Sequence, residues 1–184
     1  MPDNRQIILL LGGARSGKSY HAQALAEKFG GKVLFIATGE ALDEEMKDRI
    51  DKHKKNRPKG WKTIESPWNI SNVITEHEGY FDTVIIDCVT LLVSNLLGNE
   101  TNYSNVEQSI TDEIVTIINV MKTSKANIIM VTNEVGLGLV PDNKLGRIYR
   151  DLLGKANNLL AQNADEVYLM IAGIPVKIKD VKIQ

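Results

Sequence analysis

The feature that most constrains this chain is a short glycine-rich segment between an apolar run and a helical pattern. The segment reads Gly12-Gly13-Ala14-Arg15-Ser16-Gly17-Lys18-Ser19 and satisfies the pattern G-x-x-x-x-G-K-[ST] in full. Residues 7–11 before it are all apolar, and residues 18–29 after it have the spacing of a helix. A strand, a glycine-rich loop and a helix in this order predict a phosphate-binding loop. Both flanks disfavour the alternative, an incidental glycine-rich turn.

The residue types in this segment match the chemistry of a bound polyphosphate. Glycines let the backbone wrap closely around a phosphate, so that several N–H groups point at the anion. The start of the following helix adds partial positive charge, and Lys18 adds a full charge beside the β- and γ-phosphates. The hydroxyl of Ser19 is placed to coordinate a Mg²⁺ ion that bridges those phosphates. The segment therefore predicts binding of a nucleoside triphosphate, with Lys18 as a catalytic residue.

The rest of the chain alternates short apolar runs with helical patterns, which is typical of a parallel sheet covered on both faces. Expected strands span 7–11, 33–37, 83–87, 127–132 and 166–171, and expected helices span 18–29, 42–55, 89–97, 105–122 and 144–162. The closing stretch 167–179 reads as two strands joined near Gly173, which would place an antiparallel hairpin at the sheet edge. We expect an α/β, P-loop NTPase-type three-layer fold, with residues 1–184 forming one domain.

Charge and cysteine content exclude several other classes of protein. The 184 residues carry 22 Lys+Arg and 23 Asp+Glu, a net charge of −1, which gives no reason to expect a general nucleic-acid binder. A single cysteine, Cys88, excludes an intrachain disulfide and a cysteine zinc cluster, and the three histidines are widely scattered. No apolar stretch approaches the roughly 20 residues of a membrane span. We therefore expect a cytoplasmic protein.

Two acidic residues follow expected strands at the edge where a nucleotide would bind. Asp87 ends the apolar run 83–87, and strand carboxyl ends surround the ligand crevice in an open parallel sheet. Asp87 is thus a candidate magnesium ligand beside Ser19, although it could instead cap the next helix. Glu134 follows the run 127–132 and is either catalytic or an anchor for the glycine-containing loop after it.

A concentrated basic segment lies between positions 47 and 62. It holds eight of the 22 Lys+Arg, opposed there by only two aspartates. The segment follows the expected strand 33–37, whose end at 37–39 is expected beside the phosphate loop. His53 lies within it, three residues after Ile50 on an apolar helical face. Its position favours a packing role, but neighbouring cations would lower the pKa of its imidazole and favour a neutral nucleophile.

These motifs together resemble a known family, the bifunctional adenosylcobinamide kinase/adenosylcobinamide-phosphate guanylyltransferases of cobalamin biosynthesis. The resemblance covers about residues 7–179 and is carried by GGARSGKS at 12–19, IATGEALDEEMKDRIDKHKKNRP at 36–58, WKTIE at 61–65, VTLLVSNLL at 89–97, VTNEVGLGLVPDNKLGRIYRD at 131–151 and NADEVYLMIAGIPVKIK at 163–179. The pair HKKNRP and TNEVG is more diagnostic than the phosphate loop, which many nucleotide-binding proteins share.

The resemblance implies a two-step transferase. A kinase step phosphorylates adenosylcobinamide with ATP or GTP, and a second step transfers GMP from GTP through a guanylylated histidine, here His53. It also implies a homotrimer that binds Mg²⁺ and a corrinoid substrate. The nucleotide contacts that it implies are Gly12, Gly13, Ala14, Arg15, Ser16, Gly17, Lys18, Ser19, Ala37, Thr38, Gly39, Lys54, Lys55, Asn56, Arg57, Glu65 and Asp87. Two departures are Asp87, where some members carry Glu, and a lone His53, which is paired with another histidine in some relatives.

Two other functions remain open from the sequence. The first is a simple P-loop kinase of a small molecule or nucleotide, in which His53 only packs. The second is a non-catalytic nucleotide-binding module. A regulatory GTPase is disfavoured because the nearest approach to N-K-x-D, Asn143-Lys144-Leu145-Gly146, lacks the aspartate. The sequence assigns neither the residues that contact the corrinoid nor the group that accepts the proton in the kinase step.

Overall fold

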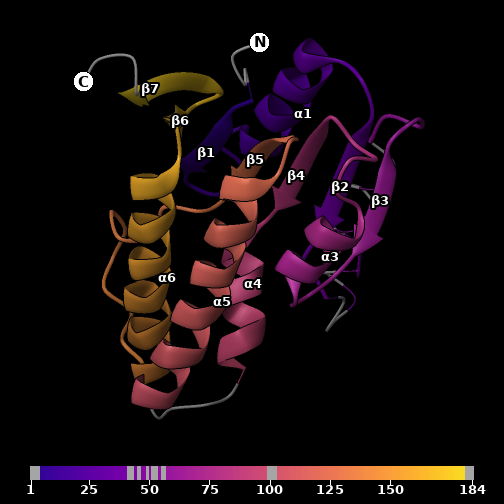
Figure 1. Cartoon of the computed structure of the whole chain (residues 1–184). Coiled ribbons are helices and arrows are strands. Elements are labelled where there is room, and N and C mark those ends of the chain that lie inside the picture. The colour runs from indigo at the N-terminus through magenta and orange to yellow at the C-terminus, as the bar shows by residue number, and fades with distance from the viewer. Residues whose placement is uncertain are drawn as a thin grey trace.

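A seven-stranded sheet forms the centre of the molecule (Figure 1). The computed structural model describes residues 5–40, 44, 47–48, 50, 54, 57–98 and 103–180. The strands are β1 (Ile7–Gly12), β2 (Val33–Ala37), β3 (Lys62–Glu65), β4 (Thr83–Asp87), β5 (Asn127–Val131), β6 (Glu166–Ile171) and β7 (Ile174–Asp180). Their order across the sheet is β3-β2-β4-β5-β1-β6-β7.

All neighbouring strands are parallel except the last pair, β6 and β7, which form an antiparallel hairpin. The inner strands β1, β2 and β4 are almost wholly buried, as expected for a parallel sheet covered on both faces. The predicted fold class, with its terminal antiparallel hairpin, is therefore confirmed.

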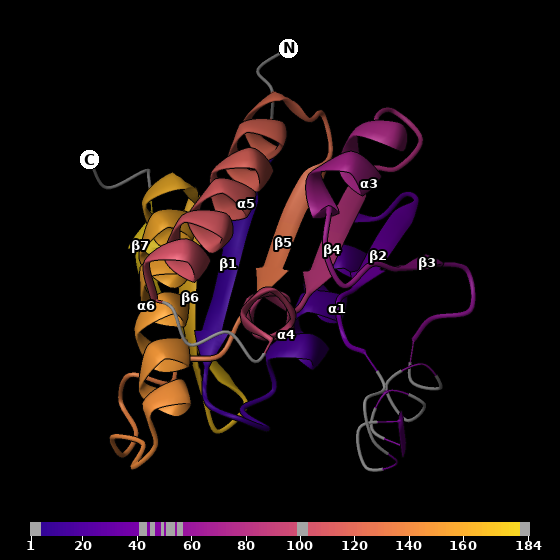
Figure 2. The same cartoon turned by 90° about the horizontal axis from the view of Figure 1, so that it is seen from below.

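Helices cover both faces of the sheet and make three layers (Figure 2). One face carries α1 (Lys18–Phe29), whose Ala22 and Ala26 pack against Leu10 and Phe35. The other face carries α3 (Ile70–Glu76), α4 (Val89–Leu97), α5 (Tyr103–Thr123) and α6 (Lys144–Asn163), which share one large apolar core with the sheet. Within the described residues, no helix is long and apolar enough to cross a lipid bilayer.

The observed elements follow the expected ones closely, with two additions. Strands at 33–37, 83–87 and 166–171 and helices at 18–29 and 89–97 have the predicted bounds, and the others differ by one or two residues. The additions are β3 and α3. Strand β3 is short and partly exposed, so it lacks the apolar run that marks a buried strand, and α3 has only seven residues. Most of the expected helix 42–55 lies outside the described residues.

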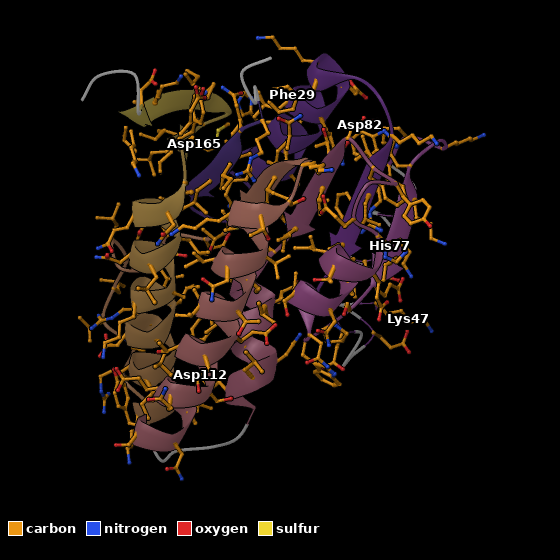
Figure 3. All side chains as sticks on the ribbon, in the orientation of Figure 1. Phe29, Lys47, His77, Asp82, Asp112 and Asp165 are labelled. Atoms are coloured by element: carbon orange, nitrogen blue, oxygen red, sulfur yellow. The ribbon has the colours of Figure 1, made fainter. Side chains whose placement is uncertain are left out.

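The two ends of the sheet differ in their polar groups. Where the strands begin, Asp82 accepts a hydrogen bond from the N–H of Lys32, and Asp165 accepts one from the N–H of Ile7 (Figure 3). Both distances are 2.7 Å, and these carboxylates are engaged in joining strands. The residues predicted to bind nucleotide lie at the opposite end, where the parallel strands terminate.

Candidate nucleotide-binding site

The phosphate-binding loop connects the buried end of β1 to the first turn of α1. Gly12 and Gly17 have φ angles of 151° and 94°, which favour glycine, and Arg15 has a φ of 57°. Gly17 is the N-cap of α1 and has no side chain, so the first N–H groups of the helix have no side-chain cap. The loop thus presents backbone donors and the positive end of α1 together, which is the arrangement that binds a phosphate.

The side chain of Lys18, the first residue of α1, is buried against the phosphate loop. Only 7% of its surface is exposed, and its Nζ donates to the carbonyl oxygens of Gly12 at 2.9 Å and Gly13 at 2.6 Å. These bonds direct the ammonium group back over the loop, where its charge is poorly screened by water. Ser19, the second residue of α1, follows directly. The structure therefore brings the predicted residues 12–19 together in one loop.

The β6–β7 hairpin supports the outer side of the phosphate loop. The N–H of Gly173, in the hairpin turn, donates to the carbonyl of Ser16 at 3.0 Å. A Cβ added at Gly12 would lie 2.6 Å from the carbonyl oxygen of Met170, and one at Gly17 would lie 3.2 Å from the Cα of Gly173. Both glycines therefore allow close contact between backbones. The sequence predicted the hairpin but not this contact.

The residues predicted at the strand ends share one row across the sheet. Ala37 is in register with Glu65 on one side and with Asp87 on the other, and Asp87 is in register with Val131. Val131 is in turn in register with Leu10, two residues before the phosphate loop begins. The carboxylates of Glu65 and Asp87 thus belong to the same edge of the sheet as the loop.

The strand order corrects one expectation about this edge of the sheet. The segment 37–39 was expected beside the phosphate loop, but β4 and β5 lie between β2 and β1, so this expectation is wrong about the neighbouring strand. Parallel strands joined by helices need not be adjacent, because crossovers can skip positions in the sheet.

Asp87 is closer to the phosphate loop than residues 37–39 are. Burial raises the pKa of the neighbouring Cys88 thiol to about 12, and the negative charge of Asp87 raises it as well. The positive charge of Lys18 lowers the same pKa, so the charges of Asp87 and of the phosphate loop both act on Cys88.

Thr38 fastens the end of β2 to the end of β4. Its N–H donates to the carbonyl of Asp87 at 3.1 Å, and its hydroxyl both donates to the Cys88 carbonyl and accepts from the Cys88 N–H. Asn95 of α4 donates to the Thr38 carbonyl at 2.8 Å. Thr38 is fully buried, so its side chain is a structural link between the two strands. Gly39 follows it and packs against Leu91.

The described part of the basic segment approaches the same carboxylates. Lys54 forms an ion pair with Glu65. The guanidinium of Arg57 lies 4.1 Å from the ring centre of Phe35, and burial lowers its pKa while the charges of Asp87 and Glu65 raise it. Among the described residues, its buried Nε and Nη1 have no hydrogen-bond partner. A half-buried guanidinium with donors to spare is suited to an anionic ligand.

Three predicted residues fall outside the part of the chain that the structure describes. They are the candidate nucleophile His53 and the candidate nucleotide contacts Lys55 and Asn56. Their neighbours Lys54 and Arg57 are described and lie near Glu65 and Asp87, as the preceding contacts show. The role predicted for His53 therefore stays a prediction.

A buried polar network behind the end of β5 was not predicted. The Thr132 hydroxyl donates to Oδ1 of Asn157 in α6 at 2.8 Å, and Nδ2 of Asn157 donates to the Asn133 carbonyl at 3.0 Å. The Asn133 N–H donates to the hydroxyl of Thr90 in α4 at 2.6 Å. The network joins two helices to the segment that leads into Glu134. An asparagine among the buried positions of α6 was the available signal.

The oxygen ligands at this edge fit a magnesium ion bound together with a nucleotide. Within the described residues, no group of three or more His, Cys, Asp or Glu side chains is arranged to hold a metal. A nucleotide-bound Mg²⁺ needs fewer protein ligands, because phosphates and waters complete its octahedral shell. The hydroxyl of Ser19 and the carboxylate of Asp87 are hard oxygen donors of the required kind. They would hold the ion against the phosphates.

The fold and the loop together define an α/β protein of the P-loop nucleotide-binding class. Residues 8–178 match the family described as cobinamide kinase / cobinamide phosphate guanyltransferase, and the chain belongs to that family. The match covers the phosphate loop, the strand-end carboxylates, the basic segment and most of the terminal hairpin, so it includes each part of the site described above.

Three curated relatives cover nearly the whole chain. The bifunctional adenosylcobalamin biosynthesis protein CobU of Salmonella typhimurium is 44% identical over 181 residues, which is 94% of this chain and 99% of the relative. The CobU protein of Escherichia coli is 42% identical over the same shares of both chains. The bifunctional adenosylcobalamin biosynthesis protein CobP of Pseudomonas aeruginosa is 36% identical over 93% of this chain and 96% of its own.

Similar solved structures support the fold at low sequence identity. A Pyrococcus horikoshii protein solved as project PH0250 has a TM-score of 0.54 at 10% identity, covering 96% of this chain and 87% of its own. The RadB recombinase has a TM-score of 0.51 at 13% identity, covering 89% and 73%. At such identities the likeness concerns the arrangement of strands and helices alone.

Proposed function

We propose that this protein phosphorylates adenosylcobinamide with ATP or GTP and then transfers GMP from GTP to the product, giving adenosylcobinamide-GDP. The observation that carries the proposal is the phosphate loop with its buried Lys18, in a chain that matches the family over residues 8–178. The curated relatives are named as bifunctional proteins of adenosylcobalamin biosynthesis, which supports both reactions.

The kinase reaction is assigned to the phosphate loop and its strand-end partners. The backbone N–H groups of residues 12–19 would hold the β- and γ-phosphates, and Lys18 would neutralise charge on the transferred group. Ser19 and Asp87 would hold the Mg²⁺ ion between those phosphates. Catalysis of this kind is mostly positioning and charge stabilisation, so a rigid loop fastened to the β6–β7 turn suits it.

The guanylyl transfer is assigned to His53. Its neutral imidazole would attack the α-phosphorus of GTP, forming an N–P bond as the bond to the pyrophosphate oxygen breaks. The phosphate of adenosylcobinamide phosphate would then attack the same phosphorus and release the imidazole, so one difficult transfer becomes two. Arg57 lies near the charges of Asp87 and Glu65, and two of its nitrogens have no hydrogen-bond partner among the described residues, so it is a suitable donor to the phosphates during both steps.

Three further features belong to the same proposal. The protein acts in the cytoplasm, where its substrates and a reduced Cys88 are expected. It takes Mg²⁺ with the nucleotide. It also assembles as a homotrimer, which gains support from exposed apolar side chains on β7: Ile174, Val176 and Ile178 are 65%, 43% and 57% exposed.

The decisive experiment tests for the covalent intermediate. The purified chain is incubated with Mg²⁺ and GTP labelled at the α-phosphate, denatured and analysed by peptide mass spectrometry. We expect an acid-labile GMP adduct on His53, absent from His53→Asn and retained in His77→Asn, a matched variant at a histidine outside the site. A wild-type protein that forms no adduct yet phosphorylates cobinamide would instead be a simple kinase. The guanylyltransferase assignment would then be wrong.

A further inference from the structure

The end of β5 lies between the two groups assigned to the nucleotide and its metal. In the sheet, β5 is paired with β1 on one side and β4 on the other, and Val131 is in register with both Leu10 and Asp87. Figure 2 shows the three strands side by side. The phosphate loop follows β1, and Asp87 ends β4. A side chain that follows β5 therefore lies at the central position of this edge, between the groups assigned to the phosphates and to the metal.

Glu134 is the acidic residue at that position. Its N–H donates to the carbonyl of Gly12 at 3.1 Å, so its backbone is fastened to the first residue of the phosphate loop. Its Oε1 accepts a hydrogen bond from the N–H of Gly136 at 2.6 Å, and the side chain is half-buried. The loop that it begins is exposed from Gly136 onward. Glu134 is thus at the boundary between the rigid sheet and an open surface from which an acceptor can approach.

The segment before Glu134 is unusually well held for a loop. Thr132 is completely buried and bonded to Asn157, and Asn133 is bonded through its N–H to Thr90 and through its carbonyl to Asn157. These bonds fix the three consecutive residues up to Glu134, together with the backbone bonds from the Thr132 N–H to Leu10 and from the Glu134 N–H to Gly12. Buried networks of this kind restrict a segment to one arrangement. A segment that only connected β5 to α6 would not need such a network.

Two other described carboxylates at this edge, Glu65 and Asp87, have a different partner or role. Glu65 forms an ion pair with Lys54, and its strand β3 is separated from β5 by two strands, β2 and β4. Asp87 is the candidate metal ligand, and a carboxylate that coordinates Mg²⁺ is a poor proton acceptor. We infer that Glu134 is a catalytic residue of the kinase step, the carboxylate that receives the hydroxyl proton of the acceptor alcohol. This inference rests on the proposed function and adds the group that the sequence did not assign.

The step balances without a further reactant. The hydroxyl oxygen of the acceptor forms a bond to the γ-phosphorus while the bond from that phosphorus to the β,γ-bridging oxygen breaks. The nucleoside diphosphate leaves with the bond electrons, and the hydroxyl proton passes to the Glu134 carboxylate and then to solvent. A positioned base typically contributes a factor of about 10² to 10⁴ in rate. In phosphoryl transfer it also orients the nucleophile.

The test separates proton transfer from loop anchoring. In Glu134→Gln the amide oxygen still accepts the Gly136 N–H bond, whereas in Glu134→Ala that bond is lost. We expect both variants to lose kinase kcat with cobinamide and ATP by about 100-fold or more. Their affinity for an ATP analogue should stay within about threefold of wild type, since neither change removes a phosphate contact. Asp142→Asn, an exposed carboxylate in the same loop, serves as the matched control and should keep the wild-type rate.

A second assay on the same preparations tests the proposed function independently. Adenosylcobinamide phosphate supplied with GTP bypasses the kinase step, so Glu134→Gln should still form adenosylcobinamide-GDP at the wild-type rate. If Glu134→Gln keeps more than a third of the kinase rate while Glu134→Ala loses it, Glu134 only anchors the loop and the inference is overturned. If the wild-type protein fails in both assays, the proposed function itself is overturned.

Discussion

Arg57 is the residue whose environment most clearly calls for a ligand. Its guanidinium is stacked on Phe35 beside the charges of Asp87 and Glu65, yet two of its buried nitrogens bond to none of the described residues. Leaving a buried donor unsatisfied costs about 1–3 kcal/mol, and more when the group is charged, so such an arrangement is kept where a bound group completes it. A nucleotide phosphate has the charge and the paired oxygens that a guanidinium binds best.

The first prediction follows from the shape of that group. Arg57→Lys keeps the positive charge but loses the planar fork and much of the stacking on Phe35. We expect GTP affinity to fall roughly tenfold to hundredfold, the loss of one or two charge-assisted hydrogen bonds of about 1.5–3 kcal/mol. Calorimetric titration with GTP measures it. Lys59→Ala, an exposed position in the same basic segment, should change affinity less than twofold. Equal affinities for Arg57→Lys and wild type would show that Arg57 does not contact the nucleotide.

Some residues of the site could be predicted from the local sequence, and others could not. Lys18, Ser19 and Asp87 belong to short motifs whose chemistry depends on immediate neighbours. The contact of Arg57 with Phe35 joins residues far apart in the chain, and no periodicity signals it. The network of Thr132 with Asn157 is likewise formed only when α6 packs beside β5. Local chemistry was readable in the sequence, and contacts made by tertiary packing were not.

At the scale of elements, the phosphate loop and the β6–β7 hairpin are in close contact. This contact explains why two positions of the phosphate-loop motif are occupied by glycine. Gly12 passes within reach of the Met170 carbonyl, and Gly17 passes against the backbone of Gly173. A side chain at position 12 would clash with this carbonyl and one at position 17 would be tightly crowded, and both glycines also have positive φ angles. The hairpin therefore contributes to the shape of the nucleotide site although none of its residues belongs to the motif.

The second prediction compares a glycine of this contact with one in open space. In Gly12→Ala the new methyl would meet a backbone carbonyl at 2.6 Å, so the loop must shift. We expect ATP affinity to fall by more than tenfold and the free energy of unfolding to fall by about 1–3 kcal/mol. Gly154→Ala lies in α6 with nothing near its added Cβ and should raise that free energy by about 0.5–1 kcal/mol. Urea denaturation and nucleotide titration measure both, and unchanged ATP binding by Gly12→Ala would contradict the account.

Element boundaries were predicted well where apolar patterning was strong. Strands β2 and β4 are continuous buried or half-buried runs, as is β6 up to Met170, and their predicted bounds agree with the observed ones. Strand β3 has the pattern Lys62-Thr63-Ile64-Glu65, with both ends exposed, and it becomes a strand only by pairing with β2. Pairing between distant segments is a tertiary effect, so an edge strand of four residues left no local signal.

At the scale of the whole molecule, strand order decides which residues meet, and local sequence does not contain it. The chain visits β1, β2, β3, β4 and then β5, but β5 is the strand inserted between β1 and β4. This insertion moves residues 37–39 away from the phosphate loop and brings Glu134 to it. Several crossover arrangements satisfy the same alternation of strands and helices, and only packing selects among them.

The β6–β7 hairpin lies at the edge of the sheet opposite β3, and it carries the feature most relevant to the assembly of several copies of the chain. Strand β7 is an edge strand whose residues 174–178 are all exposed, and three of them, Ile174, Val176 and Ile178, form an apolar row along it. On the same strand, the hydrogen bond from Lys177 to Glu166 raises the lysine pKa, and Lys177 also bonds to Asp180, so this lysine is engaged within the hairpin. An apolar row on an unpaired edge strand invites contact with another chain.

The last prediction tests whether this face joins copies of the chain in the proposed homotrimer. Ile174→Lys combined with Ile178→Lys places two charges in the apolar row, where burial against a partner would cost far more than exposure to water. We expect wild type to sediment as a trimer and the double variant to sediment as a monomer, with unfolding still cooperative because both side chains are exposed in the single chain. Tyr80→Lys, an equally exposed position in the turn after α3, should leave the trimer intact. A double variant that remains trimeric would move the interface elsewhere on the surface, and a monomeric wild type would overturn the trimer itself. Because the β6–β7 turn also contacts the phosphate loop, nucleotide affinity measured on the monomeric variant would show whether assembly stabilises the site.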